Sequence, residues 1–429
     1  MKTNKLLILA IATIIFIANS QAQNVTIPDA NFKYALLNNS GININMDSEI
    51  QFSEAAAYNG AINVSYLNIL DLTGIEAFVA LDSLNCAVNP LMSLDVSSNT
   101  LLSYLNCAGG CQSYSADPWG TQFGLLTSLD VSNNTLLSYL DCSNNDLHLG
   151  LNLTGAISLI YLDCSGHSQI SQWQGDPIWF QLGALSNLDI SSNTALETLN
   201  CSLNNLTYLD VSNNTFLNYL NCSNNNLISL NVMGASSLTF INCSNQIECL
   251  ANNVLNILDV STNTSLIDLR CQFNQLTSLD VSSNTSLALL FCYCNQLTSL
   301  NVQNGNNLNQ GLLSADCNQN LNCIQVDNAA WSNANWAFYI DPIAYFSENC
   351  SGAGLLDNNQ STAILAYPNP TSDIIYLTEQ GDITLSNFSG KLILEQKNTK
   401  QLEITALPSG IYFLRFDENN QQIVKVIKE

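Results

Sequence analysis

Histidines suited to acid–base catalysis are few in this chain, although aspartate and glutamate together number 34. Its two histidines are His148 and His167, and neither has a serine, cysteine or acid at a spacing typical of a catalytic triad. The sequence also lacks a glycine-rich phosphate loop and a paired zinc-ligand motif. Paired carboxylates that cleave glycans are the remaining enzymatic alternative, since Asp117 and Asp176 lie in two long insertions that can face each other. We therefore expect a protein that is not an enzyme, with a polysaccharide-acting enzyme as the less favoured interpretation.

The fifteen cysteines are far more regular. Most of those in the middle of the chain end a Leu-x-x-Leu-x-Cys segment, as LNYLNC does at Cys222. Because each takes the place of an inward apolar residue, we expect buried free thiols and no reactive thiolates. Ten cysteines fit this register, with a base period near 21 residues and some longer insertions: Cys86, Cys107, Cys142, Cys164, Cys201, Cys222, Cys243, Cys271, Cys292 and Cys317.

Each period holds two similar halves, LxxLxCxxN, as in LNYLNCSNN, and LxxLDVSxNT, as in LTYLDVSNN. Alternation around the inward Leu and Cys predicts a short strand in each half, and self-similarity at this period indicates a solenoid. An asparagine follows each half, where its amide can bond backbone groups of neighbouring coils that water cannot reach. These are Asn204, Asn225, Asn274 and Asn295 after the first half, and Asn99, Asn134, Asn193, Asn214, Asn263 and Asn284 after the second.

This pattern resembles the leucine-rich-repeat family over residues 66–325. The resemblance implies a β-rich leucine-rich-repeat solenoid of parallel strands, with coils of about 21 residues. A parallel β-helix is the alternative, and the LxxLxCxxN spacing favours the repeat family. Cys323 and Cys350 break the register and flank the closing segment. We interpret residues 326–351 as a C-terminal cap, stapled by a disulfide between these two cysteines, that shields the last coil.

Residues 23–65 predict a small helical N-terminal cap. IPDANFKYALLN and SEAAAYNG can each form a helix, and the segment between them matches the spacing of oxygen ligands in an EF-hand loop. It departs from that pattern where Ser48 replaces the usual glycine and where an asparagine opens the loop. We expect no cofactor other than weakly bound calcium, with a metal-free cap as the alternative. The candidate ligands are Asn43, Asn45, Asp47, Glu49 and Glu54.

The two ends of the chain predict export. Residues 1–22 have the basic start, apolar run and small-residue cleavage site of a signal peptide, and no later segment has the roughly 20 apolar residues of a membrane helix. A linker at 352–363 precedes residues 364–429, which alternate as a small C-terminal β-sandwich domain. This tail resembles the C-terminal sorting domain of type IX secretion in Bacteroidetes, through Tyr367-Pro368-Asn369-Pro370, Gly410-Ile411-Tyr412 and Lys425. The resemblance implies recognition by that secretion machinery and delivery to the outer-membrane surface or the medium.

The formal net charge is −24, and Lys33 and Arg270 are the only basic residues between the signal and residue 362. Such a field repels phosphate backbones, which argues against a nucleic-acid partner. Cations, basic proteins and neutral glycans stay compatible with it.

The predicted strand around the inward Leu and Cys turns alternate side chains to solvent. Two outward columns result: an aromatic one and a polar one beside it. Long insertions after Cys107 and Cys164 add tryptophans next to these columns, and loops on a rigid scaffold often carry binding groups. The alternative is that the tyrosines only stabilise the sheet. The predicted ligand-binding residues are Tyr104, Tyr139, Tyr161, Tyr219, Phe240, Asn106, Asp141, Asp163, Trp119, Trp173 and Trp179.

Taken together, these features predict a secreted or cell-surface leucine-rich-repeat binding protein that mediates protein–protein interaction or adhesion. A glycan-binding surface module is the alternative. The sequence does not choose between a protein and a glycan ligand.

Overall fold

A computed structural model describes residues 23–110, 112–113, 121–122, 126–166, 168–173, 176–181, 185–245, 255–307, 311–350, 366–367, 373–387, 391–416 and 423–428. Contacts divide the chain into two compact units, Met1–Cys350 and Ser351–Glu429. The expected signal peptide and linker lie outside the described residues.

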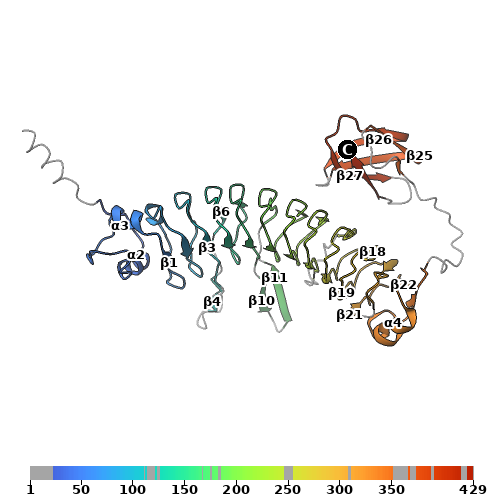
Figure 1. The fold of residues 1–429 in the computed structure, drawn as a ribbon, viewed down its shortest axis with the longest axis horizontal. Coiled ribbons are helices and arrows are strands. Elements are labelled where there is room, and N and C mark those ends of the chain that lie inside the picture. The colour runs from blue at the N-terminus through green and yellow to red at the C-terminus, as the bar shows by residue number, and fades with distance from the viewer. Residues whose placement is uncertain are drawn as a thin grey trace, which may run out of the picture. The chain divides into compact units, whose positions relative to one another are not determined.

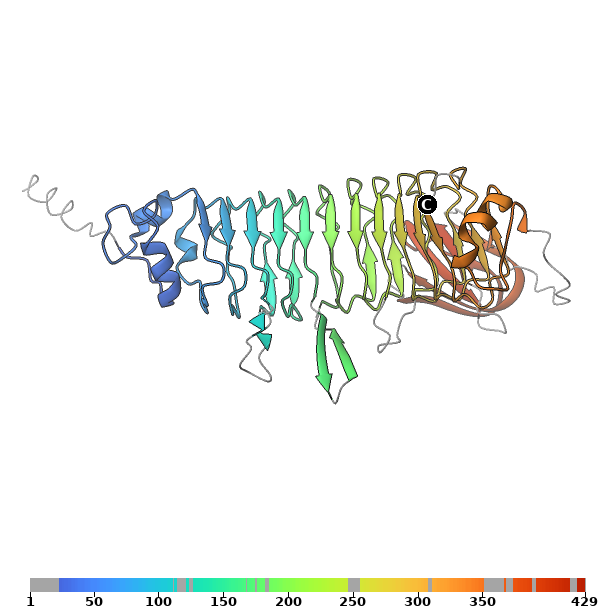
Figure 2. The same ribbon diagram turned by 90° about the horizontal axis from the view of Figure 1, so that it is seen from below.

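The first unit is a solenoid built on one parallel sheet of eleven three-residue strands (Figures 1 and 2). Neighbouring strands pair in register, so that the inner leucine of one coil lies opposite the inner leucine of the next, as Leu199 does with Leu220. The strands are, in order, β1 (Ala61–Asn63), β2 (Ser83–Asn85), β3 (Tyr104–Asn106), β7 (Tyr139–Asp141), β9 (Tyr161–Asp163), β12 (Thr198–Asn200), β14 (Tyr219–Asn221), β16 (Phe240–Asn242), β17 (Asp268–Arg270), β19 (Leu289–Phe291) and β21 (Leu312–Ser314). The leucine-rich-repeat solenoid predicted from the sequence is therefore confirmed.

The core is one continuous cluster that runs through every coil. In a typical coil, Leu217, Leu220 and Cys222 are buried, and the residues on either side of Leu220 are partly exposed. This is the alternation that a strand imposes on successive side chains. The nine cysteines from Cys86 to Cys292 in the repeat register are buried as free thiols, as expected.

Cys317 corrects one part of that expectation, because it is exposed. The inner leucine of its coil is Leu313, which pairs with Leu290, so the inward position two residues later belongs to buried Ala315. Cys317 instead takes the next turn position, whose backbone is left-handed (φ 57°), as it is at the equivalent Cys294 (φ 51°). Spacing alone placed Cys317 in the inward series of cysteines, because it lies only two residues from the inward position at Ala315. The nine buried cysteines from Cys86 to Cys292 are called the ladder thiols below.

The second half of the coil forms strands only in part. Three sets of short parallel strands lie on this side: β6 (Ser128–Asp130) with β8 (Gly150–Asn152), β13 (Tyr208–Asp210) with β15 (Ser229–Asn231), and β18 (Ser278–Asp280), β20 (Ser299–Asn301), β22 (Cys323–Gln325) and β23 (Tyr345–Ser347). Leu94, Leu188 and Leu258 occupy equivalent positions without a strand. The expectation of a strand in every second half was too broad.

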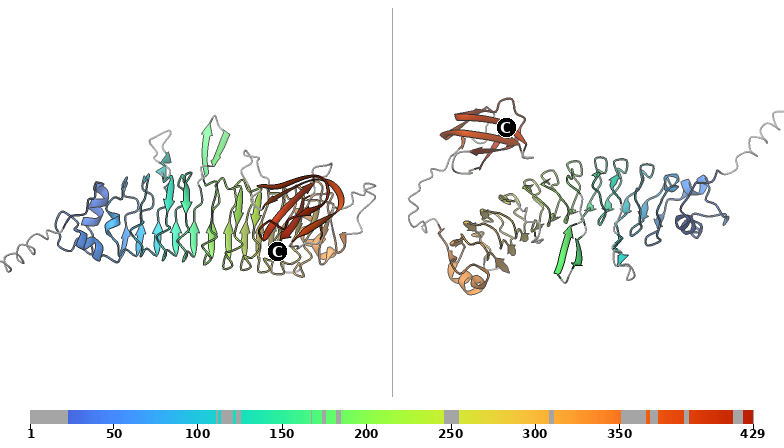
Figure 3. Two further views of the ribbon diagram at one scale, coloured as in Figure 1. Left: turned by 90° about the horizontal axis from the view of Figure 1, so that it is seen from above. Right: turned by 180° about the vertical axis from the view of Figure 1, so that it is seen from behind.

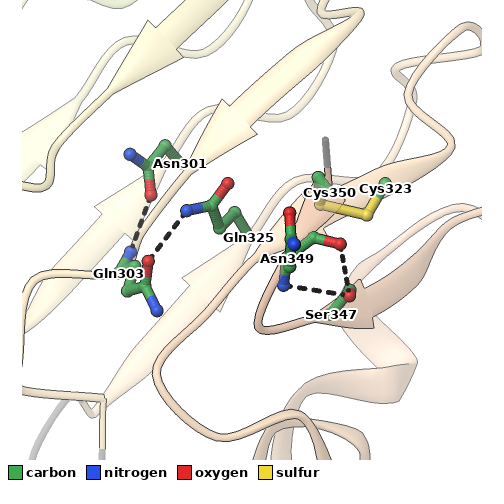
Figure 4. Close-up of a disulfide and its surroundings, with 7 residues drawn as sticks. All are labelled: Asn301, Gln303, Cys323, Gln325, Ser347, Asn349 and Cys350. Atoms are coloured by element: carbon green, nitrogen blue, oxygen red, sulfur yellow. Dashed lines mark hydrogen bonds between the residues drawn. A yellow bond between two sulfur atoms is a disulfide. The ribbon is translucent and has the colours of Figure 1, made fainter. Parts of the chain in front are cut away.

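Helices close both ends of the solenoid. At the N-terminal end lie α2 (Ala30–Leu37), which Asp29 caps, α3 (Phe52–Ala57) and the short 3-10 helix η1 (Ile75–Ala77). At the C-terminal end lie α4 (Ala329–Trp336) and η2 (Ala337–Tyr339), and Trp336 is buried beside Phe346 of β23. The disulfide between Cys323 and Cys350 is present, with a Cα–Cα distance of 5.8 Å, and ties this cap to β22 (Figure 4).

Two hairpins interrupt the repeats. They are β4 (Gln112–Ser113) with β5 (Thr121–Gln122), and β10 (Ser168–Trp173) with β11 (Asp176–Gln181). The hairpin β10–β11 protrudes beyond the edge of the coils, as the views from above and behind show (Figure 3). It leaves the solenoid between β9 and β12, at the carboxyl end of the main strands.

The second unit is a five-stranded antiparallel sheet with its own core, which includes Ile375, Leu385 and Leu414. The long strand β25 (Ile374–Asn387) pairs with β24 (Ala366–Tyr367), β26 (Leu392–Glu403) and β27 (Gly410–Phe416), and β28 (Ile423–Lys428) pairs with β27. The tail is therefore a small β-domain, as its alternation predicted, and its described strands form one antiparallel sheet.

Candidate ligand-binding face

The aromatic residues predicted from the sequence lie in one column on the eleven-stranded sheet. Tyr104, Tyr139 and Tyr161 stack ring upon ring, with 4.5 Å between successive centroids and interplanar angles of 10° and 3°. Tyr219 and Phe240 form a second stack at 4.5 Å and 3°. All five side chains are partly exposed. We call these five residues, together with Thr198 between the two stacks, the ring column.

The in-register pairing of strands produces these stacks. Tyr104 pairs with Tyr139, and Tyr139 with Tyr161, so each ring leaves the sheet directly above its neighbour. Strand spacing of roughly 4.8 Å is close to the distance at which aromatic rings stack. The parallel sheet therefore fixes a row of rings that a flexible loop could not hold.

A polar column runs beside the rings, two residues further along each strand. Asp141 and Asp163 are neighbours in it, and the side-chain amide of Asn200 donates to Asp163 Oδ2 at 2.9 Å. Each member turns its Oδ1 to a backbone N–H two residues on, as Asp141 does to Ser143. The members are Asn106, Asp141, Asp163, Asn200, Asn221 and Asn242. The ring column and the polar column together are called the aromatic face below.

Burial changes the acid–base behaviour of this face. Desolvation, and after it the carboxylate of Asp141, raises the pKa of Tyr139, and the same two kinds of cause raise the pKa of Tyr161. Desolvation also raises the pKa of Asp141, against the hydrogen bonds from Ser143. The phenols therefore stay protonated at neutral pH and offer hydroxyl groups to a ligand.

Arg270 closes the C-terminal end of the aromatic face, although it is not among the predicted ligand-binding residues. Its guanidinium donates to Asp268 at 2.9 Å and lies 5.3 Å from the ring centroid of Phe240 and 5.6 Å from that of Phe291. It occupies the polar column directly after Asn242. The sequence does set Arg270 apart, because it is the only basic residue among the repeats.

The tryptophans are placed only in part. Trp119 lies outside the described residues, as does Asp117 of the enzymatic alternative. The backbones of Trp173 and Trp179 belong to the hairpin β10–β11, where Trp173 pairs with Asp176 and Trp179 with Ile170. Their part in ligand binding stays a prediction.

Three of the five residues considered for calcium, Asn45, Asp47 and Glu54, line a hollow of about 700 Å³ in the N-terminal cap, together with Gln51 and others. Both carboxylate oxygens of Glu54 accept backbone N–H groups, from Ile44 and Asn45 on one oxygen and Gln51 on the other. These bonds complete the capping box at the start of α3.

Most of the remaining candidate oxygens of this loop also face protein donors, whereas Asn43 Oδ1 is buried without one. Asp47 Oδ2 accepts from the side-chain amides of Asn45 and Gln51, and Lys33 holds the carboxylate of Glu49 at 2.7 Å. Asn43 is buried and donates to the carbonyls of Leu37 and Asp47. Within the described ranges, no three His, Cys, Asp or Glu side chains form a group that could hold a metal. The arrangement favours the metal-free cap, and calcium binding stays a prediction to test.

The opposite side of the coil carries a column of aspartates that acts structurally. Asp95, Asp130 and Asp189 each accept the backbone N–H of the serine two residues on, at 2.8–3.0 Å. Hydrogen bonds from those serines lower the pKa of all three carboxyls. Asp210, Asp259 and Asp280 repeat the same turn. These carboxylates organise the turns on this side of the coil.

The buried thiols and the described histidine offer little chemistry. Burial raises the pKa of Cys86 and Cys243 to about 12, and that of the other ladder thiols as well, so the thiols stay protonated. The ring of His148 is exposed and contacts Asp146, while His167 lies outside the described residues.

Comparisons with known proteins agree with the two-part organisation. Residues 365–429 match the family model of the secretion system C-terminal sorting domain. The tail is therefore a sorting domain of type IX secretion, which implies export and a place outside the cell or on the outer-membrane surface. No helix in the described part of the chain is long and apolar enough to cross a bilayer. Among curated proteins, none matches this chain.

Several solved structures resemble the chain. One is the functional domain of InlJ from Listeria monocytogenes, which includes a cysteine ladder. It is 21% identical to this chain, and the match covers 95% of this chain and 100% of that one, with a TM-score of 0.29. A leucine-rich-repeat protein from Leptospira interrogans is 19% identical over 60% of this chain and 58% of its own (TM-score 0.39). An internalin, InlF, from Listeria monocytogenes is 18% identical over 76% and 95% (TM-score 0.35). The repeats and the parallel sheet define a leucine-rich-repeat solenoid, and the sorting domain places this solenoid among exported proteins.

Proposed function

We propose that this chain is a secreted or cell-surface binding protein that holds a partner protein against its aromatic face. The observation that carries the proposal is the stack of Tyr104, Tyr139 and Tyr161, three partly exposed rings in contact on a rigid sheet. Tyrosine is among the residues that contribute most to binding at protein interfaces, because it loses little conformational entropy and offers both apolar area and a hydroxyl. The stack is already ordered, so a partner does not have to order it.

The charge of the solenoid narrows the kind of partner. Asp141 and Asp163 lie beside the rings, and Arg270 is paired with Asp268. A partner with basic residues around an apolar patch complements this surface. A glycan is the second candidate, because carboxylate and amide groups beside tyrosine rings also suit sugar hydroxyls.

A substitution pair on opposite sides of the coil tests the proposal. Tyr139→Ser with Tyr161→Ser removes the middle of the stack, and Ser93→Ala with Asp130→Asn alters the opposite side. Extracts of neighbouring or host cells are passed over each immobilised protein, and a glycan array is run in parallel. We expect a specific protein to bind the original chain and the opposite-side variant and to be lost from the tyrosine variant. Retention by the tyrosine variant, shown to be folded, would place the site elsewhere, and selective glycan binding lost with the tyrosines would favour the second candidate.

A further inference from the structure

The ring column is interrupted at one coil. Thr198 pairs with Tyr161 on one side and with Tyr219 on the other, so a threonine stands where both neighbours carry a ring. Successive rings elsewhere in the column are 4.5 Å apart. Two such steps place the ring centroids of Tyr161 and Tyr219 about 9 Å apart. Only the short side chain of Thr198 stands between the points where these two rings leave the sheet.

We propose that this interruption is a slot that receives one aromatic side chain of a partner protein, stacked between Tyr161 and Tyr219. The inference rests on the proposed function and names the group that the aromatic face recognises. A ring placed midway lies about 4.5 Å from the rings of Tyr161 and Tyr219, which is the separation between successive rings of the column itself. The guest therefore supplies the missing member of a stack whose other members the sheet already holds in place.

The surroundings of the slot define what flanks the guest ring. Glu197, directly before Thr198, is exposed, and Asp163 and Asn200 lie in the polar column, beyond the ring column along the same face of the strands. Asp163 Oδ2 accepts from Asn200, which holds both side chains beside the slot. Carboxylates on both sides favour an aromatic residue with lysine or arginine next to it in the partner sequence.

Thr198 also permits a clean test, because tyrosine is native to the same column in four other coils: Tyr104, Tyr139, Tyr161 and Tyr219. Thr198→Tyr should therefore fold and fill the slot from within. Thr198→Ser keeps the slot open and is the matched control. Thermal melting of each variant confirms that the solenoid is intact.

The probe is the tripeptide Lys-Trp-Lys, blocked at both ends, with Lys-Leu-Lys as its counterpart and methyl β-glucopyranoside as a sugar. Saturation-transfer NMR on the full chain measures the binding of each. We expect the tryptophan peptide to bind in preference to the leucine peptide, to bind the serine variant equally well, and to lose about tenfold in affinity with Thr198→Tyr. Equal binding to the tyrosine variant, no preference for tryptophan, or sugar binding that Thr198→Tyr alone removes would each overturn the slot.

The two experiments distinguish a failure of the slot from a failure of the proposed function. If Tyr139→Ser with Tyr161→Ser abolishes partner binding while Thr198→Tyr leaves peptide binding unchanged, the aromatic face binds a partner and the slot is wrong. If neither change affects any binding, both proposals fail.

Discussion

The side-chain nitrogen of Asn225 donates a 3.0 Å hydrogen bond to the carbonyl oxygen of Cys201, which lies one coil earlier. The same nitrogen donates to the carbonyl of Cys222, and Asn225 Oδ1 accepts from the backbone N–H of Leu206. One buried amide therefore satisfies three backbone groups that water cannot reach. Asn214, in the second column, donates to the carbonyls of Ile190 and Asn193, and its Oδ1 is buried without a protein partner.

These contacts predict unequal costs for two Asn→Ala changes. Asn225→Ala leaves a buried N–H and two carbonyls without this partner and should lower the free energy of unfolding by roughly 3–5 kcal/mol. Asn214→Ala should cost less, about 1–2 kcal/mol, because it also removes an unpaired oxygen. Ala156 and Ala235 already occupy that column. Urea unfolding measures both, with exposed Asn213→Ala as the control, and equal losses at Asn225 and Asn214 would contradict this interpretation.

Asp141 and Asp130 should respond to pH in opposite directions. Desolvation raises the pKa of Asp141 in the folded state, so its ionisation opposes folding, and this cost appears as the pH rises from about 4 through the raised pKa. Asp141→Asn should therefore stabilise the protein at pH 7 and change little at pH 3. Asparagine fits the position, since Asn200 accepts from Ser202 as Asp141 does from Ser143.

The matched control is Asp130→Asn on the opposite side of the coil. Hydrogen bonds from Ser132 lower the pKa of Asp130, so its contribution to stability is present above about pH 4 and is lost as the pH falls. This variant should be destabilised at pH 7 and not at the lowest pH. Urea midpoints at several pH values measure both effects. Two variants with the same sign of change would show that the proposed causes are wrong.

The thiols should fall into three classes under an alkylating reagent. Cys317 is exposed and should react in the folded protein, and the half-buried Cys294, whose pKa is raised by desolvation, should react there more slowly. The ladder thiols, such as Cys201 and Cys222, are buried and protonated and should react only on unfolding. Cys323 and Cys350 should react only after reduction. Peptide mass spectrometry locates the label, and labelling of ladder thiols at the rate of Cys317 would contradict the fold.

The loop at Asp47 and Glu54 should not bind calcium tightly. A metal would have to displace the backbone and amide donors that these carboxylates already accept. We expect calorimetric titration with calcium up to about 1 mM to give no binding heat. Binding heat that disappears with Asp47→Asn but not with Glu49→Gln would instead support a calcium site in this loop.

Deletion of residues 364–429 should trap the protein in the periplasm, because the sorting domain is then missing. Fractionation followed by protease treatment of intact cells locates the protein. The solenoid forms a separate unit, so the truncated chain should keep its melting behaviour. Normal surface delivery of the truncated chain would refute the assignment of the tail.

Local periodicity was enough to predict much of the fold. A leucine that recurs every 21 residues can be buried only if coils stack, and the residues beside it must then point outward, as Tyr219 and Asn221 do around Leu220. The disulfide between Cys323 and Cys350 was also predictable, since both cysteines leave the repeat register. Cys317 shows the limit, because a shift of two residues in one coil is invisible to spacing and decides whether a thiol is buried or exposed.

The sequence by itself determined the coil, the inward and outward columns and the exported class, since these follow from residue type and repeat spacing along the chain. Only the tertiary structure decided how side chains interact across coils: the face-to-face geometry of Tyr139 on Tyr161, the position of Arg270 over Phe240, and the hydrogen bond from Asn200 to Asp163. It also showed that the oxygens of Glu54 accept backbone N–H groups. The physical reason is that the repeat fixes where each side chain leaves the backbone, whereas its partners depend on register and on the local path of neighbouring coils.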